Sequence, residues 1–261
     1  MKKILLLVAT CASLAFVADA TTYMRVKTTD GSIIKYDVEK VVEVDFTGSE
    51  DTVLTLAVSG EVDKYSYVDL GLKSGTLWAT YNVGASSPTE FGDYFAWGET
   101  SPKDDYTIDT YKWSNGRSNV MTKYSVDYSF GSKDSLLVLV PADDAATANW
   151  GSSWRMPTNE EQMELKEGCD WTWVDNFNGS GVSGSIGVSK VNGNAVFFPA
   201  GGYRDYLGPE YVFSRGYYWS SSLLTNVSYY AYEFLFYKTF IDWFSDNRFF
   251  GMNVRAVVAK P

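Results

Sequence analysis

Three short motifs, far apart in the chain, restrict its fold more than any other feature. Each joins a large aromatic residue or an arginine to glycine or small polar residues; they are residues 149–158 (NWGSSWRMPT), 216–222 (GYYWSSS) and 253–257 (NVRAV). This composition is typical of a compact, loop-rich domain in which distant segments meet around a few large side chains. We therefore expect the rings of Trp154 and Trp219 to lie in one core.

The first 20 residues have the features of a secretory signal peptide. Two lysines precede an apolar run over residues 4–17, and small residues surround a cleavage site after Ala20. The run is too short to span a bilayer and no longer one follows, so we expect no transmembrane segment. The alternative is a lipoprotein anchored through Cys11, for which Thr10 is a poor preceding residue. We expect an exported protein that is secreted, periplasmic or on the outer cell surface.

Two residue types are nearly absent, and this excludes several kinds of site. The chain has no histidine, which excludes Ser-His-Asp and Cys-His catalytic systems and histidine zinc sites. After removal of the signal peptide, Cys169 is the only cysteine, so neither an intramolecular disulfide nor a two-cysteine redox site can form. Its neighbours Glu167 and Asp170 supply no positive charge, so we expect an unreactive thiol. The fold must therefore be stabilised by its core, for which the chain supplies 9 Trp, 15 Phe and 19 Tyr.

The charge of the chain disfavours one class of partner. The net charge is −10, and an acidic protein repels the phosphate backbone of nucleic acids. We expect no nucleic-acid partner.

The pattern along the chain predicts a small unit followed by a large one. We expect four segments: a signal peptide (1–20), a small β-hairpin segment (21–47), a linker or strand (48–64) and a main domain (65–261). The hairpin rests on the Asp30-Gly31 turn signal between two strand-like runs, and residues 41–46 continue as a further strand.

The main domain mixes strands, long loops and two short helices. One helix covers residues 143–148, and a second begins at a capping box formed by Thr158 and Glu161 and ends at Gly168. We predict strands where the sequence is strand-like or alternates in aromatic residues, at residues 68–72, 76–79, 171–173, 230–236 and 252–258. These elements predict an α+β fold.

A set of motifs in the main domain carries a resemblance to a known family. The motifs are residues 67–72 (YVDLGL), 75–80 (GTLWAT), 82–85 (NVGA), 92–100 (GDYFAWGET), 143–146 (DDAA), 154–158 (WRMPT), 199–204 (PAGGYR), 216–222 and 254–255. In this order they resemble the Fibrobacter succinogenes major paralogous domain (FISUMP), which is common in exported proteins of gut Bacteroidetes. The resemblance implies a C-type-lectin-like fold, with an antiparallel sheet, two short helices and long loops. It extends, more distantly, to formylglycine-generating sulfatase modifiers and to retroelement-diversified receptors.

The chain departs from these families at several positions. Family members often carry cysteine where this chain has Tyr81 and Ser125, so Cys169 lacks a partner. The reactive cysteine pair of the formylglycine enzymes cannot be present. The lectin calcium signature, Glu-Pro-Asn or Gln-Pro-Asp, is missing, and the nearest text is Gly208-Pro209-Glu210. We expect no metal or other cofactor, with calcium left open.

Several residues of the motifs could act in binding or in structure. Arg155 and Arg255 could recognise a ligand carboxylate, but arginines in such positions are more often paired structural anchors. We assign both, with Trp154 and Trp219, to the structure. Asp143 and Asp144 could ligate calcium, but a pair at a helix start is more often a cap.

The candidate ligand-binding residues lie near the carboxyl end. Residues 237–250 hold too many aromatics to be fully solvated and too many polar residues to be fully buried. We expect Trp243, Asp246, Asn247 and Arg248 to form a binding surface, because aromatic rings beside such groups suit both sugars and protein partners. The diversified receptors place their ligand-binding residues in the corresponding region. The alternative is that these aromatics complete the core.

Three functions remain open from the sequence. The first is a non-catalytic, adhesin-like binding module that recognises a glycan or protein outside the cell. The second is a structural component of a fimbria or surface layer, suggested by the amino-terminal hairpin. The third is a glycoside hydrolase that uses two carboxylates, the acid/base chemistry left without histidine. The sequence does not define the oligomeric state.

Overall fold

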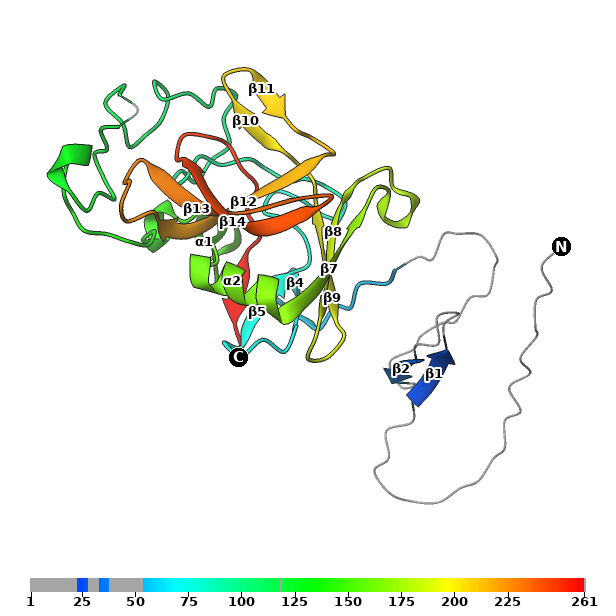
Figure 1. The fold of residues 1–261 in the computed structure, drawn as a ribbon. Helices are drawn as coiled ribbons and strands as arrows, with labels where there is room; N and C mark the ends of the chain where they lie inside the picture. The colour runs from blue at the N-terminus through cyan, green and yellow to red at the C-terminus, as the bar shows by residue number, and fades with distance from the viewer. Residues whose placement is uncertain (1–22, 28–32, 38–53, 118, 261) are drawn as a thin grey trace, which may run out of the picture. The chain divides into compact units, whose positions relative to one another are not determined.

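A computed structural model describes residues 23–27, 33–37, 54–117 and 119–260 of the chain. The chain divides into two compact units, Met1–Glu50 and Asp51–Pro261 (Figure 1). In the first unit, β1 (Tyr23–Lys27) and β2 (Ile33–Asp37) form an antiparallel pair. The predicted signal peptide, the Asp30-Gly31 turn and the predicted strand at residues 41–46 lie outside the described residues.

A five-stranded antiparallel sheet joins the two ends of the second unit. Its strands, in spatial order, are β3 (Gly60–Val62), β4 (Tyr65–Val68), β5 (Thr76–Ala79), β15 (Val257–Ala259) and β6 (Trp154–Arg155). The carboxyl-terminal β15 therefore lies between strands from two earlier parts of the chain (Figure 1). β3 lies within residues 48–64, for which the sequence left linker and strand both open.

Three further antiparallel sheets are formed by the described residues. The first contains β7 (Cys169–Val174), β8 (Gly184–Ser189) and β9 (Ala195–Pro199); the second is the hairpin of β10 (Tyr203–Asp205) and β11 (Gly208–Glu210); the third contains β12 (Arg215–Leu223), β13 (Tyr230–Tyr237) and β14 (Phe240–Asn247). In the third sheet β13 is central and β14 is an edge strand.

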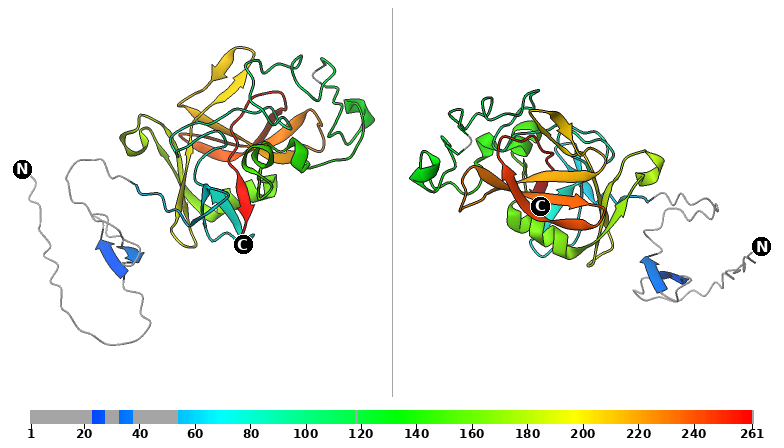
Figure 2. Two further views of the ribbon diagram at one scale, coloured as in Figure 1. Left: turned by 180° about the vertical axis from the view of Figure 1, so that it is seen from behind. Right: turned by 45° about the horizontal axis from the view of Figure 1, so that its top comes forward.

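The described elements also include two α-helices, α1 (Ala145–Trp150) and α2 (Asn159–Gly168). Three short 3-10 helices complete them: η2 (Tyr128–Phe130), η3 (Pro141–Asp143) and η4 (Phe177–Gly179). α2 begins at the predicted capping box: Thr158 Oγ1 accepts from the Glu161 amide, and the Glu161 carboxylate accepts from the Thr158 amide. It packs against all three strands of the β12–β14 sheet (Figure 2). Antiparallel sheets with two helices confirm the α+β class.

The three sequence motifs meet in the largest core cluster. Trp154, Trp219 and Val254 each have no exposed surface and belong to this one cluster. The indole nitrogens find backbone acceptors across the fold: Trp219 Nε1 donates to the Phe95 carbonyl (2.9 Å) and Trp154 Nε1 to the Val62 carbonyl (3.1 Å). Burying one such ring removes about 200 Å² of mostly apolar surface, roughly 5 kcal/mol before the cost of ordering. The predicted convergence of distant rings is confirmed.

A second core cluster lies on the other side of the β12–β13 pair. It joins Phe234 and Phe236 of β13 to Phe198 of β9 and Leu165 of α2. Gly216 of β12 is required here, because a Cβ at this position would lie 2.0 Å from the Phe236 ring. With apolar contacts on both faces, the β12–β13 pair is fixed, and β14 hydrogen-bonds to β13 as its outer neighbour.

Candidate functional site

The edge strand β14 carries three of the four predicted ligand-binding residues. Its register places Trp243 opposite Phe234 and Asn247 opposite Tyr230 of β13. Because side chains alternate along a strand, Trp243, Ser245 and Asn247 share one face of the sheet with Tyr230 and Tyr232. The core beneath Phe234 covers only part of this face.

The uncovered part of this face combines rings with polar groups. Trp243 is 42% exposed and contacts the half-buried Tyr232 edge to face, with ring centroids 5.6 Å apart. The hydroxyl of Ser245 and the amide of Asn247 are half-buried beside them. We call the set Tyr230, Tyr232, Trp243, Ser245 and Asn247 the β14 surface. It offers an apolar ring face with hydrogen-bonding groups at its border.

Asp246 lies on the opposite face of the strand, away from Trp243. Its Oδ1 accepts hydrogen bonds from the Asn247 amide (2.7 Å) and from Asn247 Nδ2 (3.2 Å), and burial raises the pKa of its carboxyl. Phe244, which is 56% exposed, shares this second face. The prediction that Asp246 and Trp243 share one surface is therefore wrong, because the two side chains lie on opposite faces of the strand.

The prediction that Arg248 lies on a binding surface is wrong. Its side chain has no exposed surface and its guanidinium lies 4.6 Å from the Trp97 ring centroid. Nε donates to the Tyr111 hydroxyl (2.9 Å), and Nη1 donates to carbonyls that include that of Ser228 (2.8 Å). The physical reason is that each of the three guanidinium nitrogens donates to an interior acceptor, so Arg248 joins the loops of Tyr111, Lys123 and Ser228 from within.

The residues predicted to be structural occupy interior or paired positions. Arg255 is 1% exposed and donates to Asn82 Oδ1 (2.8 Å) and to the Ala79 carbonyl (3.0 Å). Arg155 is half-buried and forms a two-point ion pair with the Glu161 carboxylate, Nη1 to Oε2 at 2.6 Å, which links β6 to the start of α2. Trp154 and Trp219 lie in the core described above.

The two aspartates at the start of α1 have different roles. Asp144 is the N-cap of α1, accepting from the Thr147 amide (2.9 Å), so the predicted cap is formed by this residue alone and the helix begins at Ala145, two residues later than predicted. Asp143 is 3% exposed and pairs with the ammonium groups of Lys112 (3.2 Å) and Lys123 (2.5 Å). Within the described part of the chain, neither carboxylate belongs to a group of three or more side chains that could hold a metal ion.

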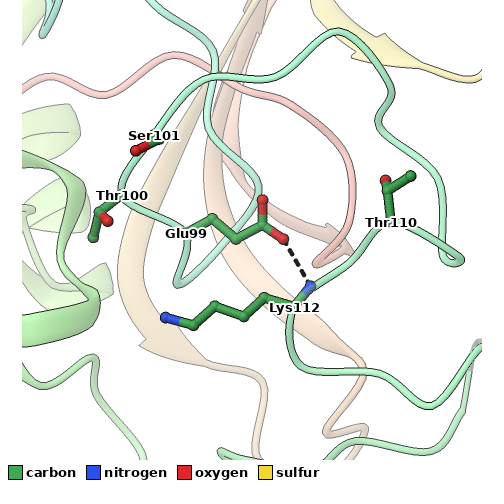
Figure 3. A pocket seen from close by; sticks show the side chains of 5 residues that line it. All are labelled: Glu99, Thr100, Ser101, Thr110 and Lys112. Atoms are coloured by element: carbon green, nitrogen blue, oxygen red, sulfur yellow. Dashed lines mark hydrogen bonds between the residues drawn. The ribbon is translucent and has the colours of Figure 1, made fainter.

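A hollow of about 280 Å³ lies elsewhere on the second unit, between two loops. Figure 3 shows its lining, which consists of Glu99, Thr100, Ser101, Thr110 and Lys112. The Glu99 carboxylate accepts from the Lys112 amide (2.8 Å) and from Lys103 Nζ (3.0 Å), so its charge is already balanced. The hollow is polar and has no aromatic lining, in contrast to the β14 surface.

The described residues offer neither a metal site nor a reactive thiol. Among the described residues no three Asp, Glu, Cys or His side chains are grouped to hold a metal ion. Cys169 is 2% exposed, and burial raises the pKa of its thiol to about 11, which leaves little thiolate at neutral pH.

None of the helices that the structure describes is both long and apolar enough to cross a membrane.

One residue near the site was missed from the sequence. Glu233 lies at a core-facing position of β13, in phase with Ala231 and Leu235, and is 1% exposed. The signal was present, since a single glutamate interrupts the alternating aromatic run at residues 230–236. Comparison with known proteins gives no assignment: no family model, curated protein or solved structure matches this chain.

Proposed function

We propose that this chain is an exported, non-catalytic binding module that recognises a glycan through the β14 surface. The observation that carries the proposal is Trp243, a 42% exposed ring that stands beside a second ring and next to polar side chains. An indole face stacks on the C–H groups of a sugar, while Asn247 and Ser245 can exchange hydrogen bonds with its hydroxyls.

The proposal includes the family and fold suggested by the motifs. The FISUMP motifs and the C-type-lectin-like fold they imply are supported by the α+β architecture, in which the motif residues Trp154, Trp219 and Val254 share one core. An export signal over residues 1–20 agrees with a ligand outside the cell. Recovery of the secreted protein with Thr21 as its first residue tests this part.

The β14 surface suits a glycan better than a protein partner. Protein interfaces concentrate their binding energy in buried pockets for large apolar side chains. The β14 surface instead presents a shallow ring pair bordered by an amide and a hydroxyl. No ion pair of the described residues includes a side chain of the β14 surface, and the nearby Lys166 ammonium is paired with Asp242 (2.7 Å), which favours a neutral sugar over an acidic one.

The carboxyl groups near the β14 surface support a glycoside hydrolase less well than a non-catalytic binding module. A glycosidase needs two carboxyls on either side of an open cleft. The acidic residues of β13 and β14, Glu233, Asp242 and Asp246, all lie on the face opposite Trp243, and Glu233 is 1% exposed. A substrate has no access to that carboxyl in this arrangement.

The proposal is tested by glycan-array binding followed by calorimetry on the strongest neutral glycan. We expect Trp243→Ala to reduce affinity by about fivefold to 150-fold, if stacking of a sugar on the indole is worth the about 1–3 kcal/mol that a base gains on an aromatic ring. Tyr206→Ala is the matched control, since Tyr206 is a more exposed ring (72%) on the β10–β11 hairpin. Equal binding by both variants removes the β14 surface as the site.

The same measurement separates the two candidate locations. Glu99→Gln changes the polar hollow and leaves the β14 surface intact, so we expect it to bind like the unmodified protein. Binding that is lost in Glu99→Gln and kept in Trp243→Ala assigns the glycan to the hollow and contradicts the proposal.

A further inference from the structure

Arg215, the first residue of β12, is a half-buried cation without a carboxylate partner. Its Nη1 donates to the Tyr217 hydroxyl (3.3 Å), and no Asp or Glu of the described residues lies within ion-pair distance of the guanidinium. Burial raises the pKa of Tyr217, so this hydroxyl is neutral and does not balance the charge. In a chain of net charge −10, a cation that no neighbouring carboxylate neutralises is available to an anion from outside.

The other half-buried cations of the described second unit differ from Arg215. Four of them form ion pairs with carboxylates: Lys103, Lys123, Arg155 and Lys166. Arg204 also lacks such a pair, but its Nε is fully buried without a hydrogen-bond partner, so a ligand cannot reach that nitrogen. None of the Arg215 nitrogens is buried in this way. Nε and Nη2 of Arg215 therefore remain as donors that solvent can reach.

Aromatic rings lie beside the Arg215 guanidinium. It is 4.1 Å from the ring centroid of Tyr211 and 5.4 Å from that of Tyr237. Tyr237 is directly opposite Arg215 in the sheet, and Phe240 is directly opposite Tyr237 and stacks on its ring, with centroids 5.0 Å apart. We call Tyr211, Arg215, Tyr237 and Phe240 the Arg215 row. Because rings contact the flat face of a guanidinium, the N–H groups in its plane are left to donate hydrogen bonds.

The turn before Arg215 holds Tyr211 in an unusual backbone conformation. The φ angle of Tyr211 is +56°, a region that bulky residues rarely adopt. Its carbonyl accepts from the amides of Ser214 and Arg215 (both 3.0 Å) and from Ser214 Oγ (2.8 Å). Three hydrogen bonds thus maintain the strained turn that places the Tyr211 ring on the guanidinium. Strain that the surrounding structure maintains is typical of ligand-binding sites.

Two glycines of the sequence motifs fix the position of Arg215. The amide of Gly202 donates to the Arg215 carbonyl (2.8 Å), and a Cβ on Gly202 would lie 1.9 Å from the Glu210 carbonyl oxygen. Gly216 directly follows Arg215 and admits the Phe236 ring against β12. The backbone on both sides of the turn is therefore held by close contacts that a larger residue would prevent.

We propose that the Arg215 row binds an acidic sugar, with Nε and Nη2 of Arg215 donating to the sugar carboxylate. A carboxylate accepts two parallel hydrogen bonds from a guanidinium, which fixes its orientation as well as its charge. The exposed rings of Tyr211 (44%) and Phe240 (36%) stand at the two ends of the row, where they can contact the C–H groups of the sugar. The choice of a sugar, but not of the carboxylate, rests on the proposed glycan-binding function.

The Arg215 row and the β14 surface are separate sites. Phe240 and Trp243 are three residues apart in β14, so they lie on opposite faces of the sheet. Asp242, on the same face as Phe240, is paired with Lys166 (2.7 Å) and does not neutralise Arg215. The row therefore suits an acidic residue of a glycan, whereas the β14 surface suits a neutral one.

The test is an NMR titration of the unmodified protein at constant ionic strength, observing the Nε–H signal of Arg215. The probe is methyl β-glucuronide, and the matched controls are methyl β-glucoside, which lacks the carboxylate, and acetate, which lacks the sugar. We expect the glucuronide to shift this signal with saturation and to bind at least tenfold more tightly than either control.

Each other result of the titration overturns the proposal. No saturable shift with the glucuronide removes Arg215 as a binding residue, and equal affinity for the glucoside removes the carboxylate from recognition. Equal affinity for acetate shows that the row takes any carboxylate, including that of an acidic peptide, and overturns the assignment to a sugar.

Substitutions identify the guanidinium that binds. We expect Arg215→Gln to weaken glucuronide binding at least tenfold, and Arg215→Lys to restore only part of it, because lysine keeps the charge but not the two in-plane donors. Arg117→Gln is the matched control, since Arg117 is an exposed arginine of the same charge and should bind like the unmodified protein. Binding that is lost in Arg204→Gln and kept in Arg215→Gln overturns the proposal. If Arg215→Gln does not fold, the titration of the unmodified protein decides alone.

Failure of this inference can be distinguished from failure of the proposed function. The neutral glycan reports on Trp243 and the glucuronide on Arg215, and each ligand is measured separately. Glucuronide binding that is lost in Trp243→Ala and kept in Arg215→Gln overturns the inference and leaves the β14 surface as the site.

Discussion

The buried arginine Arg248 gives the sharpest test of how this loop-rich fold is held together. We expect Arg248→Met to destabilise the protein strongly, because methionine fills much of the same volume but donates no hydrogen bond. The substitution removes the donors to the carbonyls of Lys123, Tyr124 and Ser228 and to the Tyr111 hydroxyl.

The magnitude follows from the acceptors left behind. Three buried carbonyls without a partner cost about 1–1.5 kcal/mol each, and the lost contact of the guanidinium with the Trp97 ring adds to this. We therefore expect the free energy of unfolding to fall by about 3–5 kcal/mol, a large part of the stability of a typical domain. Lysine cannot replace the fork of donors, so Arg248→Lys should recover only part of the loss.

The measurement is urea unfolding followed by tryptophan fluorescence, with the midpoint and slope fitted together. Arg117→Met is the matched control, because Arg117 is exposed and its change should stay within about 0.5 kcal/mol. A change of less than about 1 kcal/mol in Arg248→Met, together with lost glycan binding, would show that Arg248 contacts a ligand and would refute the reasoning.

Three further substitutions and modifications test separate parts of the fold. Thr158→Ala removes one half of the capping box and should cost about 1 kcal/mol in urea unfolding, which Thr158→Ser should restore; equal stability of the two variants would contradict the cap. Gly216→Ala places a methyl group 2.0 Å from the Phe236 ring and should cost about 1–3 kcal/mol, whereas an unchanged midpoint would mean that the β12–β13 pair can shift freely. Cys169, with its thiol pKa raised to about 11 by burial, should react with iodoacetamide at neutral pH much more slowly in native than in urea-unfolded protein, and equal rates would show that it is accessible.

Local signals in the sequence predicted the elements that depend on neighbouring residues. The strand β5 (Thr76–Ala79) has its predicted bounds, and α2 begins at the predicted capping box. Asp144 caps α1 because an aspartate before a short alanine-rich run can bond an amide three residues ahead. In each case the partner atoms lie within a few residues.

Long-range partners could not be read from the sequence. The predicted strand over residues 252–258 is reduced to β15 (Val257–Ala259), because the preceding residues bridge separately to Phe95 and Tyr218. Arg248 was misassigned for the same reason, since its carbonyl acceptors lie 20 to 125 residues away.

The candidate site was predicted in part. Aromatic density directed the prediction to residues 237–250, and in the structure Trp243 of this segment is exposed. Trp243 and Asp246 are separated because side chains alternate along a strand, and no strand was predicted over this segment. That Tyr232 belongs to the β14 surface could not be predicted, because its contact with Trp243 depends on the register between β13 and β14.

The most direct test of the glycan-binding proposal is the indole N–H signal of Trp243 in a ¹H–¹⁵N spectrum, assigned with Trp243→Phe. On titration with the strongest neutral glycan we expect this signal to shift and saturate, while the signals of the buried Trp154 and Trp219 stay fixed. A saturable shift of residues around Glu99, with the Trp243 signal unmoved, would contradict the account.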